Sequence, residues 1–66
     1  MKFEEVFPRL LEGYYARRKD WKGYWVWENN TIMIYCKDGE VLDIRKTKNV
    51  KFTIENMLAD DWMIFL

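Results

Sequence analysis

The densest apolar pattern of the chain lies between Tyr24 and Arg45, which reads YWVWENNTIMIYCKDGEVLDIR. Three short apolar runs are separated here by Asn29-Asn30 and by Asp38-Gly39. Both dipeptides favour two-residue hairpin turns, because Asn tolerates a positive φ and Gly adopts one without steric cost. The pattern therefore predicts a three-stranded antiparallel meander.

Two-residue turns would fix the strand pairing, and with it the face of the sheet on which each side chain lies. Trp27 would face Ile32 in the first hairpin, and Cys36 would face Val41 in the second. One face would carry Tyr24, Val26, Met33, Tyr35, Leu42 and Ile44. The other would carry Trp25, Trp27, Ile32, Ile34, Cys36 and Val41. Neither face is polar, so each needs cover from a helix, a ligand or another subunit.

An amphipathic helix is predicted at the N-terminus, where the apolar residues recur at helical spacing: Phe3, Val6, Phe7, Leu10 and Leu11. Pro8 should kink this helix or leave it regular only beyond that point, and Gly13 is a candidate C-cap. We expect the helix to cover the face that carries Tyr24. No second long helix remains for the opposite face. We therefore predict an oligomer interface there, formed by Trp25, Trp27, Ile32 and Ile34.

The remaining segments complete a single small α+β domain over residues 1–66. Residues 14–18 are β-prone, and residues 46–51 form a polar connection. Thr53 is a plausible N-cap for a helix of one or two turns. Residues 62–66 read as a short apolar strand beside the meander. The predicted fold is an N-terminal helix packed on a small antiparallel sheet, the meander plus a C-terminal strand, with a short second helix.

Size and cysteine content narrow the class of protein. A chain of 66 residues buries only ~60% of its unfolded surface, and such chains commonly gain stability by association. Cys36 is the only cysteine and histidine is absent, which argues against an internal disulfide and against a metal site. There is no secretory segment and no apolar run of ~18 residues, so we expect a cytoplasmic protein that does not span a membrane.

Charge and missing residue types narrow the function. The 11 basic and 11 acidic residues give a net charge of zero, which argues against binding a nucleic acid polymer. Without His or Ser, no Ser/His or Cys/His nucleophile-base pair can form. A carboxylate pair drawn from Asp43, Asp60 and Asp61 remains, but nothing in their spacing requires catalysis. We therefore expect no enzymatic activity and no cofactor.

A basic corner surrounds Trp21, in the segment RRKDWKG that begins at Arg17. An indole ring offers a flat surface for a nucleobase, and a guanidinium group of Arg17 or Arg18 can grip a phosphate in a bidentate way. The same pattern also fits a solvated loop with Trp21 resting on the edge of the core.

Two blocks of the chain carry a resemblance to a known family. The first contains Phe3, Val6, Phe7, Leu10, Gly13, an arginine at 17 or 18, and Trp21. The second is the closing run Met57, Leu58, Ala59, Asp60, Asp61 and Trp62. Together they resemble the Thoeris anti-defence 2 family of phage proteins. This resemblance implies a small α+β protein, homotetrameric in known members. It also implies that the protein binds a cyclic ADP-ribose-type signal of a bacterial defence system and keeps it from its effector.

The resemblance also implies roles for individual residues. The tryptophan matching Trp21 stacks on the ligand, and the turn before the closing Asp-Trp lines the same pocket, which points to Asn56 and Asp60. Two features depart from the family pattern. Asp20 stands where a glycine usually precedes this tryptophan, and a middle segment of longer relatives is missing between the meander strands. Asp20 would place a negative charge near a bound pyrophosphate.

Two functions follow from the sequence. The first is a sponge in the host cytoplasm, which binds and sequesters a cyclic nucleotide without cleaving it, as a homo-oligomer (a tetramer or a dimer). Trp21 would stack on the base, Arg17 or Arg18 would hold phosphate, and Asn56 or Asp60 would bind ribose hydroxyls. The alternative is a small protein-interaction or inhibitor module that uses the aromatic sheet face.

Overall fold

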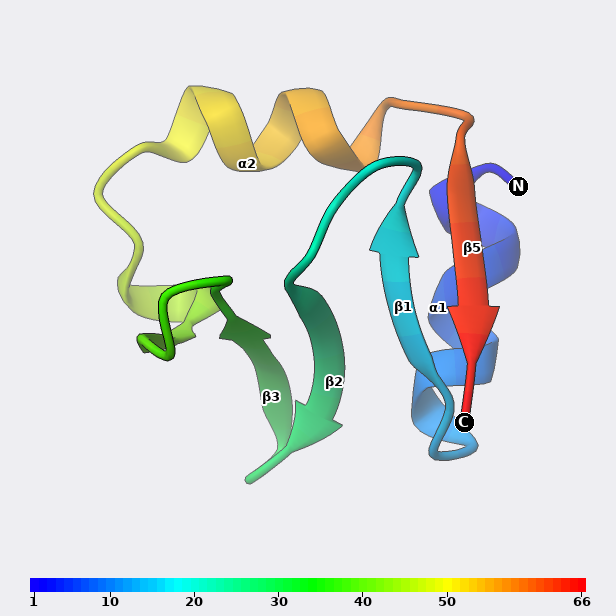
Figure 1. The fold of residues 1–66 in the computed structure, drawn as a ribbon, viewed down its shortest axis with the longest axis horizontal. Helices are drawn as coiled ribbons and strands as arrows, with labels where there is room; N and C mark the ends of the chain where they lie inside the picture. The colour runs from blue at the N-terminus through cyan, green and yellow to red at the C-terminus, as the bar shows by residue number, and fades with distance from the viewer.

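Two α-helices, one 3-10 turn and five strands make up the fold (Figure 1). The computed structural model describes all residues, 1–66. In chain order the elements are α1 (Phe3–Leu11), β1 (Tyr15–Arg18), β2 (Tyr24–Glu28), β3 (Thr31–Tyr35), β4 (Val41–Asp43), η1 (Ile44–Lys46), α2 (Val50–Met57) and β5 (Trp62–Phe65). The predicted α+β class is confirmed. Neither helix is long and apolar enough to cross a membrane.

The strands form one antiparallel sheet in the order β4-β3-β2-β1-β5. The C-terminal strand joins this sheet beside β1, with Arg18 paired to Trp62. The first hairpin is the predicted one: Asn29 and Asn30 have φ values of 55° and 62°, and Trp27 pairs with Ile32. A two-residue turn with positive φ at both positions suits two asparagines, because their short polar side chains tolerate this conformation.

The predicted register of the second hairpin is wrong by one residue. Tyr35 pairs with Val41, and Ile34 pairs with Leu42. Of the turn residues only Gly39 has a positive φ, 92°, and the loop closes with hydrogen bonds from Cys36 N to Glu40 O and from Gly39 N to Cys36 O. This is the longer hairpin loop that ends in a left-handed glycine. Leu42 therefore lies on the face of Ile34, and Cys36 lies beyond the end of β3.

Helix α1 covers the face of the sheet opposite to the one we predicted. Phe3 and Phe7 pack edge-on against Trp25 and Trp27, with ring centroids 5.7 and 5.8 Å apart. The buried apolar core consists of Val6, Leu10, Ala16, Trp25, Ile32 and Trp62. Ala16 pairs with Trp25, and its small side chain lets α1 approach the sheet closely. The face that we expected to need a second subunit is thus covered by α1 itself. Our reason for an oligomer interface at Trp25, Trp27, Ile32 and Ile34 no longer holds.

The opposite face of the sheet carries a row of stacked rings. Tyr15 stacks on Tyr24 at 5.1 Å, and Tyr24 stacks on Tyr35 at 5.0 Å. Phe65 packs edge-on against Tyr15 and Tyr24. Because α1 lies on the other face, we call this row of Tyr15, Tyr24, Tyr35 and Phe65 the open tyrosine face.

The helix ends differ in part from prediction. Helix α1 runs from Phe3 to Leu11 with Pro8 inside it, and Gly13 follows its C-cap with a φ of 102°. Helix α2 begins three residues before Thr53. Its N-cap is Asn49, whose side chain accepts a hydrogen bond from Phe52 N at 3.0 Å. Asn is a stronger N-cap than Thr, which explains the earlier start.

Candidate functional site

One large cavity, of about 950 Å³, lies between the sheet and α2. Its wall combines the loop before β2, the adjoining ends of β2 and β3, the connection from η1 to α2, and one side of α2. Its ring-bearing and apolar lining includes Trp21, Tyr24, Trp25, Ile34, Tyr35 and Phe52. Small-molecule sites in proteins are typically ~300–1,000 Å³ and are lined mainly by such side chains. The cavity is therefore large enough for a nucleotide-sized ligand.

The loop before β2 is held in place by its backbone. Asp20 has a φ of 69°, which favours glycine, and Trp21 N donates to Arg18 O at 3.1 Å to close the turn. Asp is among the non-glycine residues that tolerate this conformation. A Cβ at Gly23 would collide with the carbonyl oxygen of Tyr35. The loop can therefore lie close against the end of β3.

Trp21 is half-buried and joins the cavity to the core. Its ring packs against Trp62 at 5.3 Å and against Trp25 at 6.0 Å, while it also lines the cavity. This packing is what the solvated-loop interpretation expected, with Trp21 resting on the edge of the core, whereas that interpretation does not account for the cavity that the ring lines. Phe52 lies on α2, is 58% exposed, and lines the same cavity. Two aromatic rings from separate elements are therefore available to a ligand.

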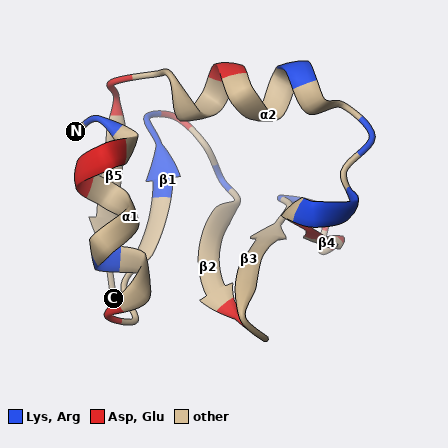
Figure 2. Ribbon diagram, turned by 180° about the vertical axis from the view of Figure 1, so that it is seen from behind, with Lys and Arg blue, Asp and Glu red and all other residues tan.

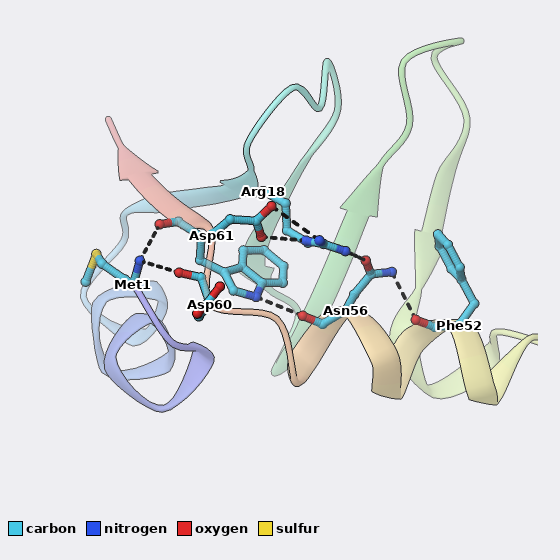
Figure 3. A network of polar contacts seen from close by, with 7 residues as sticks. Met1, Arg18, Phe52, Asn56, Asp60 and Asp61 are labelled. Atoms are coloured by element: carbon cyan, nitrogen blue, oxygen red, sulfur yellow. Dashed lines mark hydrogen bonds and ion pairs between the residues drawn. The ribbon is translucent and has the colours of Figure 1, made fainter.

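A polar network ties the C-terminal half of α2 to the sheet (Figure 3). Arg18 donates from Nε and Nη2 to the two carboxylate oxygens of Asp61, at 2.7 and 3.2 Å, and from Nη1 to Asn56 Oδ1 at 2.7 Å. Asn56 Nδ2 donates to Phe52 O, and Trp62 Nε1 donates to Asn56 O at 2.9 Å. Hydrogen bonds from Arg18 lower the pKa of Asp61. The network fixes the position of the helix that forms one wall of the cavity.

The two ends of the chain meet beside this network. The N-terminal ammonium of Met1 donates to Asp60 O at 3.0 Å and to Trp62 O at 2.9 Å (Figure 3). Asp60 contributes its backbone carbonyl here, while its exposed side chain lies outside the cavity lining. The turn before β5 is thereby attached to the start of α1.

The structure brings only two of the predicted ligand-binding residues to the cavity, Trp21 and Asn56. Asn56 is buried, and both polar atoms of its side chain are bonded within the chain. Arg17 and Arg18 point to opposite faces of β1, as strand alternation requires. Arg17 lies over the Phe65 ring at 4.8 Å, and Arg18 is held by Asp61. Neither arginine lines the cavity, so the predicted arginine contact to phosphate has no support in the structure.

Sequence reasoning placed Lys22 in the basic corner but missed the other lysines of the cavity wall. Lys22, Lys37, Lys46 and Lys48 line it, together with the carboxylates of Asp20 and Glu40. The alternation of Lys46 and Lys48 in the polar connection was the available signal. Cys36 also lines the cavity, and burial, with help from nearby acidic groups, raises the pKa of its thiol. The neutral thiol is therefore a poor nucleophile. No three His, Cys, Asp or Glu side chains come together in a way that could hold a metal ion.

The fold and the cavity define a small α+β protein in which a helix, the sheet and three loops border one open, ligand-sized space. A family model described as the Thoeris anti-defense 2-like domain matches residues 1–65. The chain therefore belongs to this family, as the two sequence blocks had indicated. No curated protein and no solved structure gives a significant match to the chain.

Proposed function

We propose that this protein is a phage anti-defence sponge, which binds a cyclic ADP-ribose-type or related cyclic nucleotide signal and withholds it without cleaving it. Membership of the Thoeris anti-defense 2-like family indicates the anti-defence role. The observation that carries the proposal is the position of Trp21, whose ring lines a cavity of about 950 Å³. A flat ring on the wall of such a space suits a nucleobase.

In this proposal the base stacks on Trp21, which contributes about 1–3 kcal/mol, as is typical of base–aromatic stacking. Asn56 has a positioning role, because its amide is already bonded to Arg18 and to the backbone of α2. These hydrogen bonds fix the position of α2 relative to the sheet. Asp60 acts through its backbone at the junction of the chain ends. Thr53 and Asn49 line the cavity and offer polar atoms to the ribose hydroxyls.

The residues that line the cavity favour binding over chemistry. The chain contains neither His nor Ser, and the raised pKa of Cys36 keeps its thiol protonated. General acid–base catalysis would need a pair of carboxylates, one acting as acid and the other as base. The two lining acids, Asp20 and Glu40, come from separate loops. A ligand would therefore leave the site as it entered.

Calorimetric titration with a panel of cyclic ADP-ribose isomers and cyclic dinucleotides tests the proposal. We expect at least one member to bind the wild type, and we expect Trp21→Ala to weaken that binding by roughly ten- to a hundredfold. Trp21→Phe is the matched control, because it keeps a stacking surface and much of the packing against Trp62. Circular dichroism must show that both variants are folded. A wild-type protein that binds no member of the panel would refute the proposal, and so would a folded Trp21→Ala variant with unchanged affinity.

The open tyrosine face favours a second candidate, a surface for protein contacts. Tyr15 on this face is 37% exposed and Met63 is 41% exposed. An inhibitor module could use such a face against a partner, and a homo-oligomer (a tetramer or a dimer) could use it between copies of the chain. Sedimentation equilibrium separates these cases: Tyr15→Glu should lower the mass of a homo-oligomer. If the wild-type protein stays monomeric at high concentration, the homo-oligomer is ruled out.

A further inference from the structure

The charge of the cavity wall differs from that of the chain as a whole. Four lysines line the cavity against two carboxylates, Asp20 and Glu40, so the wall carries a formal charge of four minus two, or +2. The chain has 11 basic and 11 acidic residues and a net charge of zero. The rest of the chain must therefore carry −2. Positive charge is concentrated where a ligand would lie.

None of these lysines is used in an ion pair within the chain. All three ion pairs use arginine: Arg9 with Glu12, Arg18 with Asp61, and Arg45 with Asp43. The four lysines come from three separate segments of the chain. Lys22 precedes β2, Lys37 lies in the turn after β3, and Lys46 and Lys48 lead into α2. All four residues are exposed, and no ion pair within the chain engages them.

The segment that bears Lys46 and Lys48 is held against the start of α2. The hydroxyls of Thr47 and Thr53 lie 3.4 Å apart, and Thr47 also donates to Ile44 O. Figure 2 shows this segment in blue at the end of α2 that lies away from β1. The positive end of the α2 dipole is at the same place, and Asn49, Phe52 and Thr53 line the cavity beside it. The positive wall is thus formed mainly at the N-terminal end of α2.

We propose that Lys46 and Lys48, assisted by Lys22 and Lys37, form a phosphate-binding wall, which recognises the diphosphate of the ligand. The identity of the ligand as a nucleotide rests on the proposed function, whereas the anion-binding wall does not. A diphosphate bridge carries one negative charge on each phosphate, which matches the +2 charge of the wall. Lysine suits this task because its ammonium group acts as a mobile point charge. The base then points toward Trp21 and the phosphates toward the start of α2.

The test uses two probes, inorganic pyrophosphate and the cyclic nucleotide panel, on the full chain. We expect the double variant Lys46→Gln, Lys48→Gln to weaken both affinities, by about three- to tenfold for each lysine, as direct charge contacts near water would. The matched control is Lys19→Gln, Lys51→Gln, which removes the same charge from two exposed lysines outside the cavity lining. It should change neither affinity by more than about twofold, since exposed charges that do not contact the anion are screened by salt.

The outcomes separate this inference from the proposed function. If the nucleotide binds the lysine double variant as tightly as the wild type, the phosphate-binding wall is refuted and the sponge stands. If pyrophosphate binds and depends on Lys46 and Lys48 while no cyclic nucleotide binds, the wall stands and the sponge falls. Wild-type protein that does not bind pyrophosphate at millimolar concentration refutes the wall. Salt titration of the wild type checks the same point without a variant, because binding through the lysines must weaken as ionic strength rises.

Discussion

Replacement of Trp62 is the sharpest test of how the two ends of the chain and α2 are held together. Trp62 is 1% exposed, and its ring lies within 5.3 Å, between centroids, of Phe3, Trp21 and Trp25. Its Nε1–H donates to Asn56 O at 2.9 Å. The side chain therefore joins the core beneath α1 to the helix that bounds the cavity.

Two substitutions separate packing from hydrogen bonding. Trp→Ala in a core typically costs about 3–5 kcal/mol. A domain of 66 residues has a stability of roughly 3–10 kcal/mol in total, so Trp62→Ala should lose about a third or more of it. Trp62→Phe keeps a ring but loses the donor. Asn56 O also accepts from Ala59 N at 3.2 Å, so it is not left without a partner. The lost bond then costs only about 0.5–1.5 kcal/mol.

The smaller ring of Phe also loses packing contacts. Together the two losses should lower the stability of Trp62→Phe by about 2 kcal/mol, which corresponds to a fall in Tm of about 8–16 °C. Thermal and urea unfolding, followed by circular dichroism, measure this. Met63→Ala is the control, because the neighbouring side chain is 41% exposed on the other face of β5 and should change stability by no more than about 0.5 kcal/mol. A Trp62→Phe variant as stable as the wild type would refute the role of the indole hydrogen bond. A Trp62→Ala variant as stable as the wild type would refute the packing of the core.

Three further predictions concern the cavity and its supports. Asp20→Asn keeps a side chain that tolerates a positive φ but removes a negative charge from the wall, so calorimetry should show an affinity for pyrophosphate about two- to fivefold higher. Phe52→Ala should weaken nucleotide binding by about tenfold in the same assay while changing Tm little, because the ring is 58% exposed. Arg18 lowers the pKa of Asp61 in the folded state. The ionised Asp61 carboxylate therefore stabilises the fold above the ordinary carboxyl pKa of about 4, and this stabilisation is lost as the pH falls through the lower folded pKa. Tm measured from pH 6 down should therefore fall less steeply below about pH 4 for Asp61→Asn than for the wild type.

Each of these predictions has a result that contradicts it. Unchanged or weaker pyrophosphate binding by Asp20→Asn would show that this carboxylate does not face the bound anion. Full nucleotide affinity in Phe52→Ala would show that the Phe52 ring does not stack on the nucleotide. If Tm falls as steeply in acid for Asp61→Asn as for the wild type, other carboxylates dominate unfolding in acid. Asp43 is the foremost of these, since Arg45 also holds its pKa well below the usual range.

The fold could be predicted where one residue type decided the local backbone. Two asparagines with positive φ fixed the first hairpin and its register. The second hairpin could not be predicted in the same way, because Asp38-Gly39 suits two loop lengths and only the structure shows that Gly39 alone is left-handed. Nor could the face under α1 be chosen from the pattern, since both faces of the sheet are apolar. The small Ala16 on β1 was the available clue.

The site was harder to predict because it depends on pairings between distant residues. Trp21 was found from the chemistry of its surroundings and from the family resemblance, and it lines the cavity. Arg17 or Arg18 was expected at the phosphate, but Arg17 lies over Phe65, and Arg18 is held by Asp61, which is 43 positions away. Strands β2, β3 and β4 lie between Lys22 and Lys48 in the sequence, and no local sequence pattern links the two lysines. Only the folded chain brings them to one cavity.

Capture and recovery of the nucleotide test the central claim most directly. Wild-type protein is incubated with a cyclic ADP-ribose isomer that binds in the calorimetric panel, separated from free nucleotide, and denatured by heat, and the released material is measured by mass spectrometry. Sequestration predicts that the nucleotide remains with the protein through the separation and is released intact, whereas the Trp21→Ala variant retains much less. Recovery of a hydrolysed product, or equal retention by the wild type and the Trp21→Ala variant, would contradict it.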